Sequence, residues 1–173
     1  MFYNNRGILQ KNYAAKLNFL IEKDALFNKN KTKRFLLTRS WSDGEKQNSC
    51  VFIMLNPSTA DCKNDDPTLK KCIYYSNKFG HNKLSVINLF PHISTVPRLK
   101  DFSFCKKNHS IVKEVISENE IIYLAWGFNF KIKKWLKRVL ENKKVFVLEM
   151  SKNNTPKHPL YLKKNLNPIP IYF

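Results

Sequence analysis

The chain has 173 residues, 43% of them hydrophobic and 13% aromatic, which suits one domain with one buried core and excludes a disordered segment. Its 31 lysines and arginines against 13 acidic residues give a formal net charge of +18, which favours a polyanionic partner such as nucleic acid, although a Lys- and Asn-rich chain can also reflect the coding genome. No apolar run approaches the roughly 20 residues that span a bilayer, and no apolar stretch with a cleavage site follows the N-terminus, so we expect a cytoplasmic protein without membrane contact.

The N-terminal part is expected to be helical. Residues 10–27 place apolar side chains at helical spacing, and the segment NKNKTKR at 28–34 is typical of a solvated basic linker. We therefore divide the chain into a helical extension with its linker, residues 1–33, and a single α/β domain, residues 34–173.

The rest of the chain alternates between apolar strands and amphipathic helices. Asp66 followed by Pro67 predicts a helix start, because Asp accepts hydrogen bonds from free N–H groups and Pro suits the first helical position; Gly80 ends that helix. A short strand at 34–41 precedes four core strands at 50–55, 83–90, 120–126 and 143–150, with further helices at 106–118 and 129–141. The alternation predicts a three-layer α/β/α fold around a mainly parallel four-stranded central sheet.

Polar and aromatic residues follow each of the four core strands. These segments are 56–58, 88–91, 126–127 and 157–162. Ligands of parallel α/β sheets bind beyond the carboxyl ends of the strands, so the four segments predict one site on one rim.

Several of these motifs occur together in a known family. MLNPSTAD (54–61), DDPT (65–68), VINLF (86–90), AWG (125–127) and KHPLYL (157–162) follow one another as in a bacterial and phage family catalogued as domain of unknown function 1643. The chain resembles that family from about Phe35 to Leu162. It departs from it at FNF, residues 128–130, where the family usually has small residues.

The order of these segments also resembles, more distantly, the uracil-DNA glycosylase superfamily. Members of that superfamily place a polar residue and a proline after the first strand, a base-reading asparagine after the second and a histidine-proline loop after the last. The resemblance implies a glycosylase-like fold and hydrolysis of the N-glycosidic bond of a flipped base, including a modified one, with no metal or other cofactor.

The resemblance also implies roles for individual residues. Asn56 would orient the attacking water, His158 would donate a hydrogen bond to the leaving base, and Asn88 would read one edge of the base. Asn88 holding its own loop, and Trp126 and Tyr161 packing in the core, are the structural alternatives. The other residues expected to contact the substrate are Pro57, Ser58, Phe90, Trp126, Gly127, Leu160 and Tyr161, the last pair as a wedge in the gap left by the base.

Three aspartates follow the first core strand. An amide is a weak base, so catalysis by Asn56 calls for a carboxylate. Asp61 is the preferred candidate, with a loop-closing hydrogen bond to Ser58 or Thr59 as its alternative. We expect Asp66 to act as a helix cap and Asp65 to be solvated.

Basic residues elsewhere are candidates for contacts with the nucleic-acid backbone. These are His92, Lys131, Lys133, Lys134, Lys157 and Lys163, with a solvated helix face as the alternative. His81 and His109 are interpreted as surface residues. The four cysteines, Cys50, Cys62, Cys72 and Cys105, contain no C-x-x-C pair, so we expect reduced, mostly buried thiols and no metal site.

The leading hypothesis is a glycosylase-like enzyme acting on DNA. A hydrolase or transferase for free nucleotides or nucleosides is the alternative enzyme, and a non-catalytic nucleic-acid-binding module is the third possibility. The base, the strandedness, RNA as substrate, the oligomeric state and the setting (repair, phage defence or nucleotide metabolism) stay open.

Overall fold

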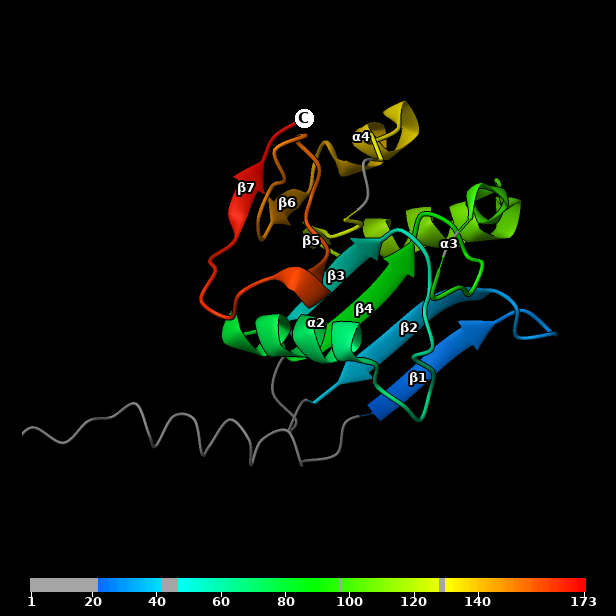
Figure 1. Ribbon diagram of the computed structural model, residues 1–173. Coiled ribbons are helices and arrows are strands. Elements are labelled where there is room, and N and C mark those ends of the chain that lie inside the picture. Colours follow the sequence, from blue (N-terminus) through cyan, green and yellow to red (C-terminus); the bar gives the residue numbers. More distant parts are fainter. Residues whose placement is uncertain (1–21, 42–46, 97, 128–129) are drawn as a thin grey trace, which may run out of the picture.

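The computed structural model describes residues 22–41, 47–96, 98–127 and 130–173, and these form one seven-stranded sheet with helices on both faces (Figure 1). The strand order is β1-β2-β4-β3-β5-β6-β7. The strands are β1 (Glu22–Phe27), β2 (Arg34–Ser40), β3 (Ser49–Met54), β4 (Lys83–Asn88), β5 (Ile121–Leu124), β6 (Lys144–Val147) and β7 (Ile169–Ile171). The helices are α2 (Pro67–Lys78), α3 (Lys106–Ser117) and α4 (Lys134–Leu140), with short 3₁₀ turns η1 (Leu99–Phe102) and η2 (Pro159–Tyr161).

The sheet is mixed, and the prediction of a mainly parallel four-stranded sheet is wrong. The predicted core strands do form a parallel centre, in which β3 pairs with β4 and β5, and β5 pairs with β6. Antiparallel strands extend both edges, β2 and β1 beyond β4 and β7 beyond β6. The sequence of β7, Ile-Pro-Ile, is too short to show a strand period, which explains why it was missed.

The helix predicted for residues 10–27 is also wrong where it can be compared. Residues 1–21 lie outside the described part of the chain, and Glu22–Phe27 form the edge strand β1. Residues 28–33 of the predicted basic linker form the turn between β1 and β2, where Asn28 N donates to Lys33 O across 3.0 Å and Lys31 has φ +52°, and Arg34 begins β2. The sheet therefore begins before residue 34.

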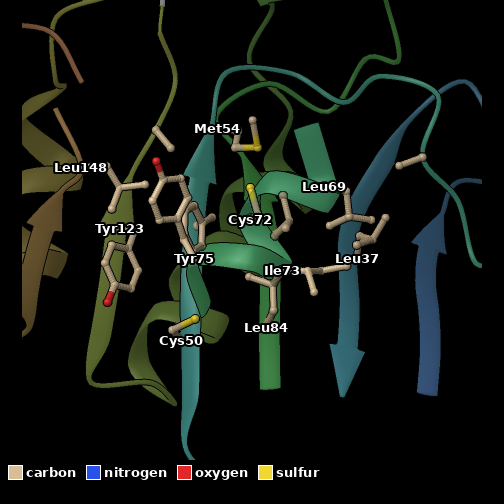
Figure 2. Close-up of a cluster of buried hydrophobic side chains, with 14 of the residues drawn as sticks. Leu37, Cys50, Met54, Leu69, Cys72, Ile73, Tyr75, Leu84, Tyr123 and Leu148 are labelled. Carbon is tan, nitrogen blue, oxygen red and sulfur yellow. The ribbon is translucent and has the colours of Figure 1, made fainter. Parts of the chain in front are cut away.

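Alternate residues of the central strands point to opposite faces and build two cores. On one face Phe52 and Met54 of β3 pack with Leu69 and Cys72 of α2 (Figure 2). On the other face Val51, Ile53 and Ile87 pack with α3 and α4 through Val112, Ile116, Leu136 and Leu140. This is the predicted α/β class with helices on both sides of the sheet.

The helix boundaries agree with the sequence signals at α2 and α3. Asp66 Oδ1 accepts the N–H of Leu69 at 2.7 Å, Pro67 opens α2, and Gly80 follows its end with φ +80°. The third helix is shorter than predicted, because α4 begins at Lys134 instead of residue 129. Within the described residues, no helix is both long and apolar enough to cross a membrane.

Candidate functional site

A cleft of about 320 Å³ opens at the rim where β3 and β5 end. It collects side chains from three of the four predicted segments, those after β3, β5 and β6. The lining residues are Leu55, Asn56, Ser58, Thr68, Ser94, Thr95, Trp126, Gly127, His158, Leu160 and Tyr161. The predicted convergence on one rim is thus present, although residues 88–91 do not line the cleft and the loop after β4 contributes Ser94 and Thr95 instead.

The floor of the cleft narrows into an inner cavity of about 30 Å³, which has room for one or two water molecules. Asn56, Ser58, Thr68 and His158 line both spaces. Arg34 and Asp66 line only the inner one, so a carboxylate and a guanidinium stand at its far side.

Asn56 is held by the loop that follows β4. Its Nδ2 donates to Ser94 O at 2.8 Å and to Pro57 O at 3.1 Å, while Ser94 N donates to Pro57 O at 2.9 Å. Both amide hydrogens are therefore committed to backbone carbonyls. Among the described residues nothing donates to Asn56 Oδ1, which leaves this oxygen as the acceptor available to a ligand.

Gly127 brings the loop after β5 against His158. Its φ is +74°, and a Cβ at this position would lie 2.3 Å from His158 Cβ, so only glycine allows both the conformation and the contact. Gly127 N also donates to Pro156 O at 2.8 Å. The AWG and HPLYL motifs therefore form one packing unit.

The histidine loop is fixed from its other side by α2. Lys71 Nζ donates to Leu162 O at 2.5 Å, and the Tyr75 hydroxyl donates to Lys163 O. His158 precedes the turn η2, where its Nδ1 accepts the N–H of Leu160 at 3.4 Å. An accepting Nδ1 leaves the proton on Nε2, so the ring is a hydrogen-bond donor at that atom.

The pKa of His158 lies below its ordinary value. Burial lowers it, and the negative charge of Asp66 acts in the opposite direction. The ring is therefore neutral at pH 7, in agreement with an Nδ1 that accepts a hydrogen bond and an Nε2 that carries the proton.

Arg34 enters the inner cavity from β2. It is 4% exposed; its Nη1 donates to Ala60 O at 2.6 Å and its Nη2 lies 3.5 Å from Asn88 Oδ1. Its buried Nε has no hydrogen-bond partner among the described residues. Burial lowers the pKa of Arg34 to about 10, so it stays cationic at neutral pH.

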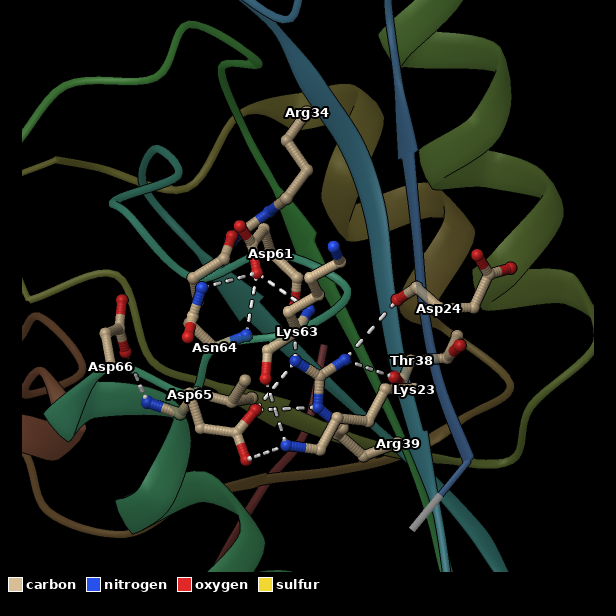
Figure 3. A network of polar contacts seen from close by, with 12 residues as sticks. Lys23, Asp24, Arg34, Thr38, Arg39, Asp61, Lys63, Asn64, Asp65 and Asp66 are labelled. Atoms are coloured by element: carbon tan, nitrogen blue, oxygen red, sulfur yellow. Dashed lines mark hydrogen bonds and ion pairs between the residues drawn. The ribbon is translucent and has the colours of Figure 1, made fainter.

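The three aspartates of the loop have three different surroundings (Figure 3). Asp61 Oδ1 accepts the backbone N–H groups of Lys63 and Asn64, both at 2.7 Å, and these bonds lower its pKa. The loop-closing alternative for Asp61 is thus present, with different partners from those expected, and Asp61 lines neither the cleft nor the inner cavity.

Asp65 is an ion-pair residue, so its predicted solvation is wrong. Its Oδ1 lies 2.9 Å from Nε and 2.7 Å from Nη2 of Arg39, and its Oδ2 lies 3.1 Å from Lys23 Nζ. Asp66 caps α2 as predicted. It is also the aspartate of this loop that reaches the inner cavity, where its Oδ2 has no partner among the described residues.

Asn88 lies beneath the site and does not line it. The residue is 1% exposed, its Oδ1 faces Arg34, and its Nδ2 is buried without a partner among the described residues. Its backbone oxygen accepts Asn108 Nδ2 at 2.9 Å. This placement gives no support to base reading by Asn88.

The predicted aromatic residues are divided between the cleft and the protein interior. Trp126 lines the cleft but is buried, and its Nε1 donates to Phe130 O at 2.9 Å, in agreement with the core alternative. Tyr161 is 79% exposed at the cleft mouth beside the exposed Leu160. Phe90 lies away from the cleft, against Phe102 and Phe130.

The predicted basic residues do not form one surface. Lys131, Lys133 and Lys134 are exposed at the start of α4, whereas Lys163 is exposed beside α2 on the opposite face of the sheet. Two others have partners, since Lys157 pairs with Glu149 at 2.5 Å and His92 Nε2 lies 3.5 Å from Ser103 Oγ.

Two histidines predicted at the surface are at least partly buried. His81 is buried, with its Nε2 3.1 Å from the Tyr123 hydroxyl, and the half-buried His109 packs on Trp135 at 4.3 Å. Of the free cysteines, Cys50 and Cys72 are buried and Cys62 is exposed. Across the described ranges, no three His, Cys, Asp or Glu side chains come together as a metal ligand set.

Arg34 is the site residue that sequence reasoning missed, because it was included in the basic linker. A charged residue directly before the apolar run Phe35–Leu37 was the available signal. Asp66 was identified only as a cap, since its second oxygen acquires a role from the fold alone. Thr68 belongs to the DDPT motif but was not assigned a role, and Thr95 had no distinguishing sequence feature.

Over residues 34–160 the chain matches the family described as Protein of unknown function (DUF1643), and it belongs to that family. The match confirms the resemblance drawn from the MLNPSTAD and HPLYL motifs. It contains Arg34, Asn56, Asp66 and His158, so the inner cavity lies within the part of the chain that the family shares. No curated protein and no solved structure matched the chain.

Proposed function

We propose that this member of the DUF1643 family hydrolyses the N-glycosidic bond of a flipped nucleobase in DNA. One observation carries the proposal: Asn56, Asp66 and His158 line a cavity with room for water that opens into a cleft of about 320 Å³. The cleft is in the size range of small-ligand sites. The motif order resembles that of uracil-DNA glycosylases, and this resemblance is the reason for proposing the same chemistry.

In this proposal the inner cavity holds the attacking water. Asn56 Oδ1 and Asp66 Oδ2 are both acceptors without partners among the described residues, so each can take one hydrogen of a water between them. The water oxygen attacks C1′ of the sugar as the C1′–N bond breaks, and its proton passes to Asp66. The carboxylate also stabilises the cationic sugar that develops.

The leaving base takes the electron pair of the broken bond. His158 lines the cleft, and its Nε2–H would donate a hydrogen bond to the base as negative charge develops on it. Arg34 lines the inner cavity and holds a positive charge near Asp66. Tyr161, exposed at the mouth, is placed to contact the duplex or the neighbouring base.

The test is mass-spectrometric detection of free bases released from natural and modified DNA, both single- and double-stranded. Asp66→Asn is the most informative variant. Asn caps helices as well as Asp does but cannot act as a general base, so the fold should be kept while catalysis is lost. We expect base release to fall by about 10²–10⁴-fold in Asp66→Asn and in His158→Ala.

Asp61→Asn is the matched control, since Asp61 closes a turn outside both cavities. It should release bases like the wild type. Loss of release in Asp61→Asn with full release in Asp66→Asn would return the catalytic role to Asp61 and overturn the assignment. No release from any DNA, with binding retained, would favour a non-catalytic binding module.

A second candidate is hydrolysis or transfer on a free nucleoside or nucleotide. The size of the cleft favours this second candidate, because a single nucleoside fills such a space. Asn88, the residue expected to read the base, is buried and does not line the cleft. The same assay with free nucleosides and nucleotides separates the two. Faster turnover of the free molecules than of DNA would establish this second candidate.

A further inference from the structure

A second cavity, of about 290 Å³, lies outside the cleft, between the loop after β4 and the helices α3 and α4. Six ring side chains line it. They are Phe90, Phe102, Phe104, His109, Phe130 and Trp135.

The rings form two groups in contact, Phe90 with Phe102 and Phe130, and His109 with Phe104 and Trp135. Phe90 meets Phe130 edge-on, with centroids 5.3 Å apart and planes at 89°, and His109 meets Trp135 at 4.3 Å and 64°. Phe104 is 77% exposed, an uncommon state for a phenylalanine. The exposed ring of Phe104 is therefore available to stack on a planar ligand.

One buried polar group in the wall adds a hydrogen-bonding preference. Asn108 is 2% exposed, and its Nδ2 donates to Asn88 O at 2.9 Å and to Leu89 O at 3.3 Å. Its Oδ1 has no partner among the described residues. This oxygen is closed off from solvent, so a ligand reaches it only when the rings separate, and the N–H groups that all nucleobases carry would then supply its missing partner.

The electrostatics of the wall favour an anion. Lys133 lines the cavity with its Nζ 5.2 Å from the Phe130 ring, and α3 begins beside it at Lys106 without a side-chain cap or an acidic residue in its first turn. A planar ring with N–H groups attached to a phosphate is a nucleotide.

We infer that this cavity binds an unpaired nucleobase of a nucleic-acid strand. The two cavities share a wall, because Trp126 of the cleft donates its Nε1–H to the backbone of Phe130, which lines the second cavity. One strand can therefore place a nucleotide in the cleft and a neighbouring base between these rings. The identity of that strand rests on the proposed function, whereas base binding itself does not.

The test compares two single-stranded oligonucleotides of equal length, one with bases and one built from abasic residues, by fluorescence anisotropy. Wild-type protein is expected to bind the base-bearing strand more tightly. Phe104→Ala, a change at an exposed side chain, should weaken that binding by about 5- to 100-fold and leave abasic binding unchanged. Tyr172→Ala, which removes an exposed aromatic ring that lines neither cavity, is the matched control and should bind like the wild type.

Equal binding of the two strands, or equal effects of Phe104→Ala and Tyr172→Ala, would overturn the inference. So would concentration-dependent self-association that Phe104→Ala abolishes, since the rings would then be an interface between copies of the chain. Asp66→Asn separates the two proposals, because it should slow base release by about 10²–10⁴-fold and keep the preference for the base-bearing over the abasic strand, since Asp66 does not line the aromatic cavity. Base-dependent binding without base release from any DNA would keep this inference and end the proposed glycosylase function.

Discussion

Strand β2 carries two buried arginines, and their surroundings differ in one respect. Every nitrogen of Arg39 has an acceptor: Nε and Nη2 bind Asp65, Nη2 also binds Asp61 O, and Nη1 binds Thr38 O. Arg34 binds Ala60 O firmly and Asn88 Oδ1 at the limit of hydrogen-bond length, and its Nε has no partner among the described residues.

This difference assigns two roles within the acidic loop, since Asp65 holds the loop in place and Asp66 lines the candidate site. A saturated buried network fixes the chain, because each polar group has exchanged water for a protein partner. An unsaturated buried cation beside a small cavity retains capacity for a ligand. The acidic residues after β3 thus hold the loop on Arg39 through Asp65, and only Asp66 is shared with the inner cavity of Arg34.

The largest expected effect is on stability, from breaking the saturated network. Asp65→Ala would leave the fully buried Arg39 without its counter-charge, and removing one partner of a buried pair costs about 3–5 kcal/mol. Denaturant unfolding should show a midpoint well below that of the wild type. Asp61→Ala is the control: a loss of stability as large as that of Asp65→Ala would mean that turn closure, not the ion pair, holds the loop.

The same experiment on the unsaturated arginine should give the opposite pattern. Arg34→Met removes a poorly satisfied buried charge and keeps an unbranched side chain, so stability should change by less than about 1.5 kcal/mol. Base release should fall by about 100-fold, because the inner cavity loses its positive charge. An unchanged rate would make Arg34 a structural residue like Arg39 and remove the contrast.

The two glycines with positive φ extend the comparison to the loop that contacts His158. Gly127→Ala meets both a left-handed backbone and His158 Cβ at 2.3 Å, whereas Gly80→Ala, at φ +80°, meets nothing within 4 Å. Gly80→Ala should therefore cost about 1–2 kcal/mol from the backbone alone and leave base release unchanged. Gly127→Ala should cost more and also reduce base release, since His158 must move. Equal effects of the two variants on release would show that the contact with His158 does not position the ring.

Local signals in the sequence were enough for much of the fold. The Asp66–Pro67 start of α2 and the four apolar core strands were predicted because caps and continuous apolar runs have local physical causes. The edges were not, because β1 and β7 are defined by pairing with β2 and β6, and Glu22–Phe27 reads equally well as part of an amphipathic helix. Strand pairing between distant segments has no local signature.

The residues of the candidate site also fall into two groups, those with a local sequence signal and those that depend on distant contacts. Asn56, Gly127 and His158 were found because each follows a strand and the rim of a parallel sheet collects such residues. The choice between Asp61 and Asp66 depended on where the loop folds back. The buried Arg39 fixes that fold, and it lies 22 residues before Asp61 and 26 residues before Asp65, too far for a local motif to show. Side chains with two oxygens can be both cap and ligand, which a sequence pattern does not distinguish.

The smallest predicted effect compares the buried histidines by pH. His81 is 5% exposed, with Nε2 3.1 Å from the Tyr123 hydroxyl and Nδ1 3.3 Å from Asn48 Oδ1, and burial lowers its pKa as it lowers that of His158. The unfolded chain, with a histidine pKa of about 6.5, takes up protons before the folded chain does. The contribution of the buried histidines to the free energy of unfolding should therefore be fully present above that pH and decline as the pH falls below it.

In His81→Asn this decline should be shallower in denaturant titrations between about pH 7 and 5. The acid limb of base release, which reports His158, should keep its position. An acid limb that moves in His81→Asn would mean that the limb follows unfolding and not the protonation of His158.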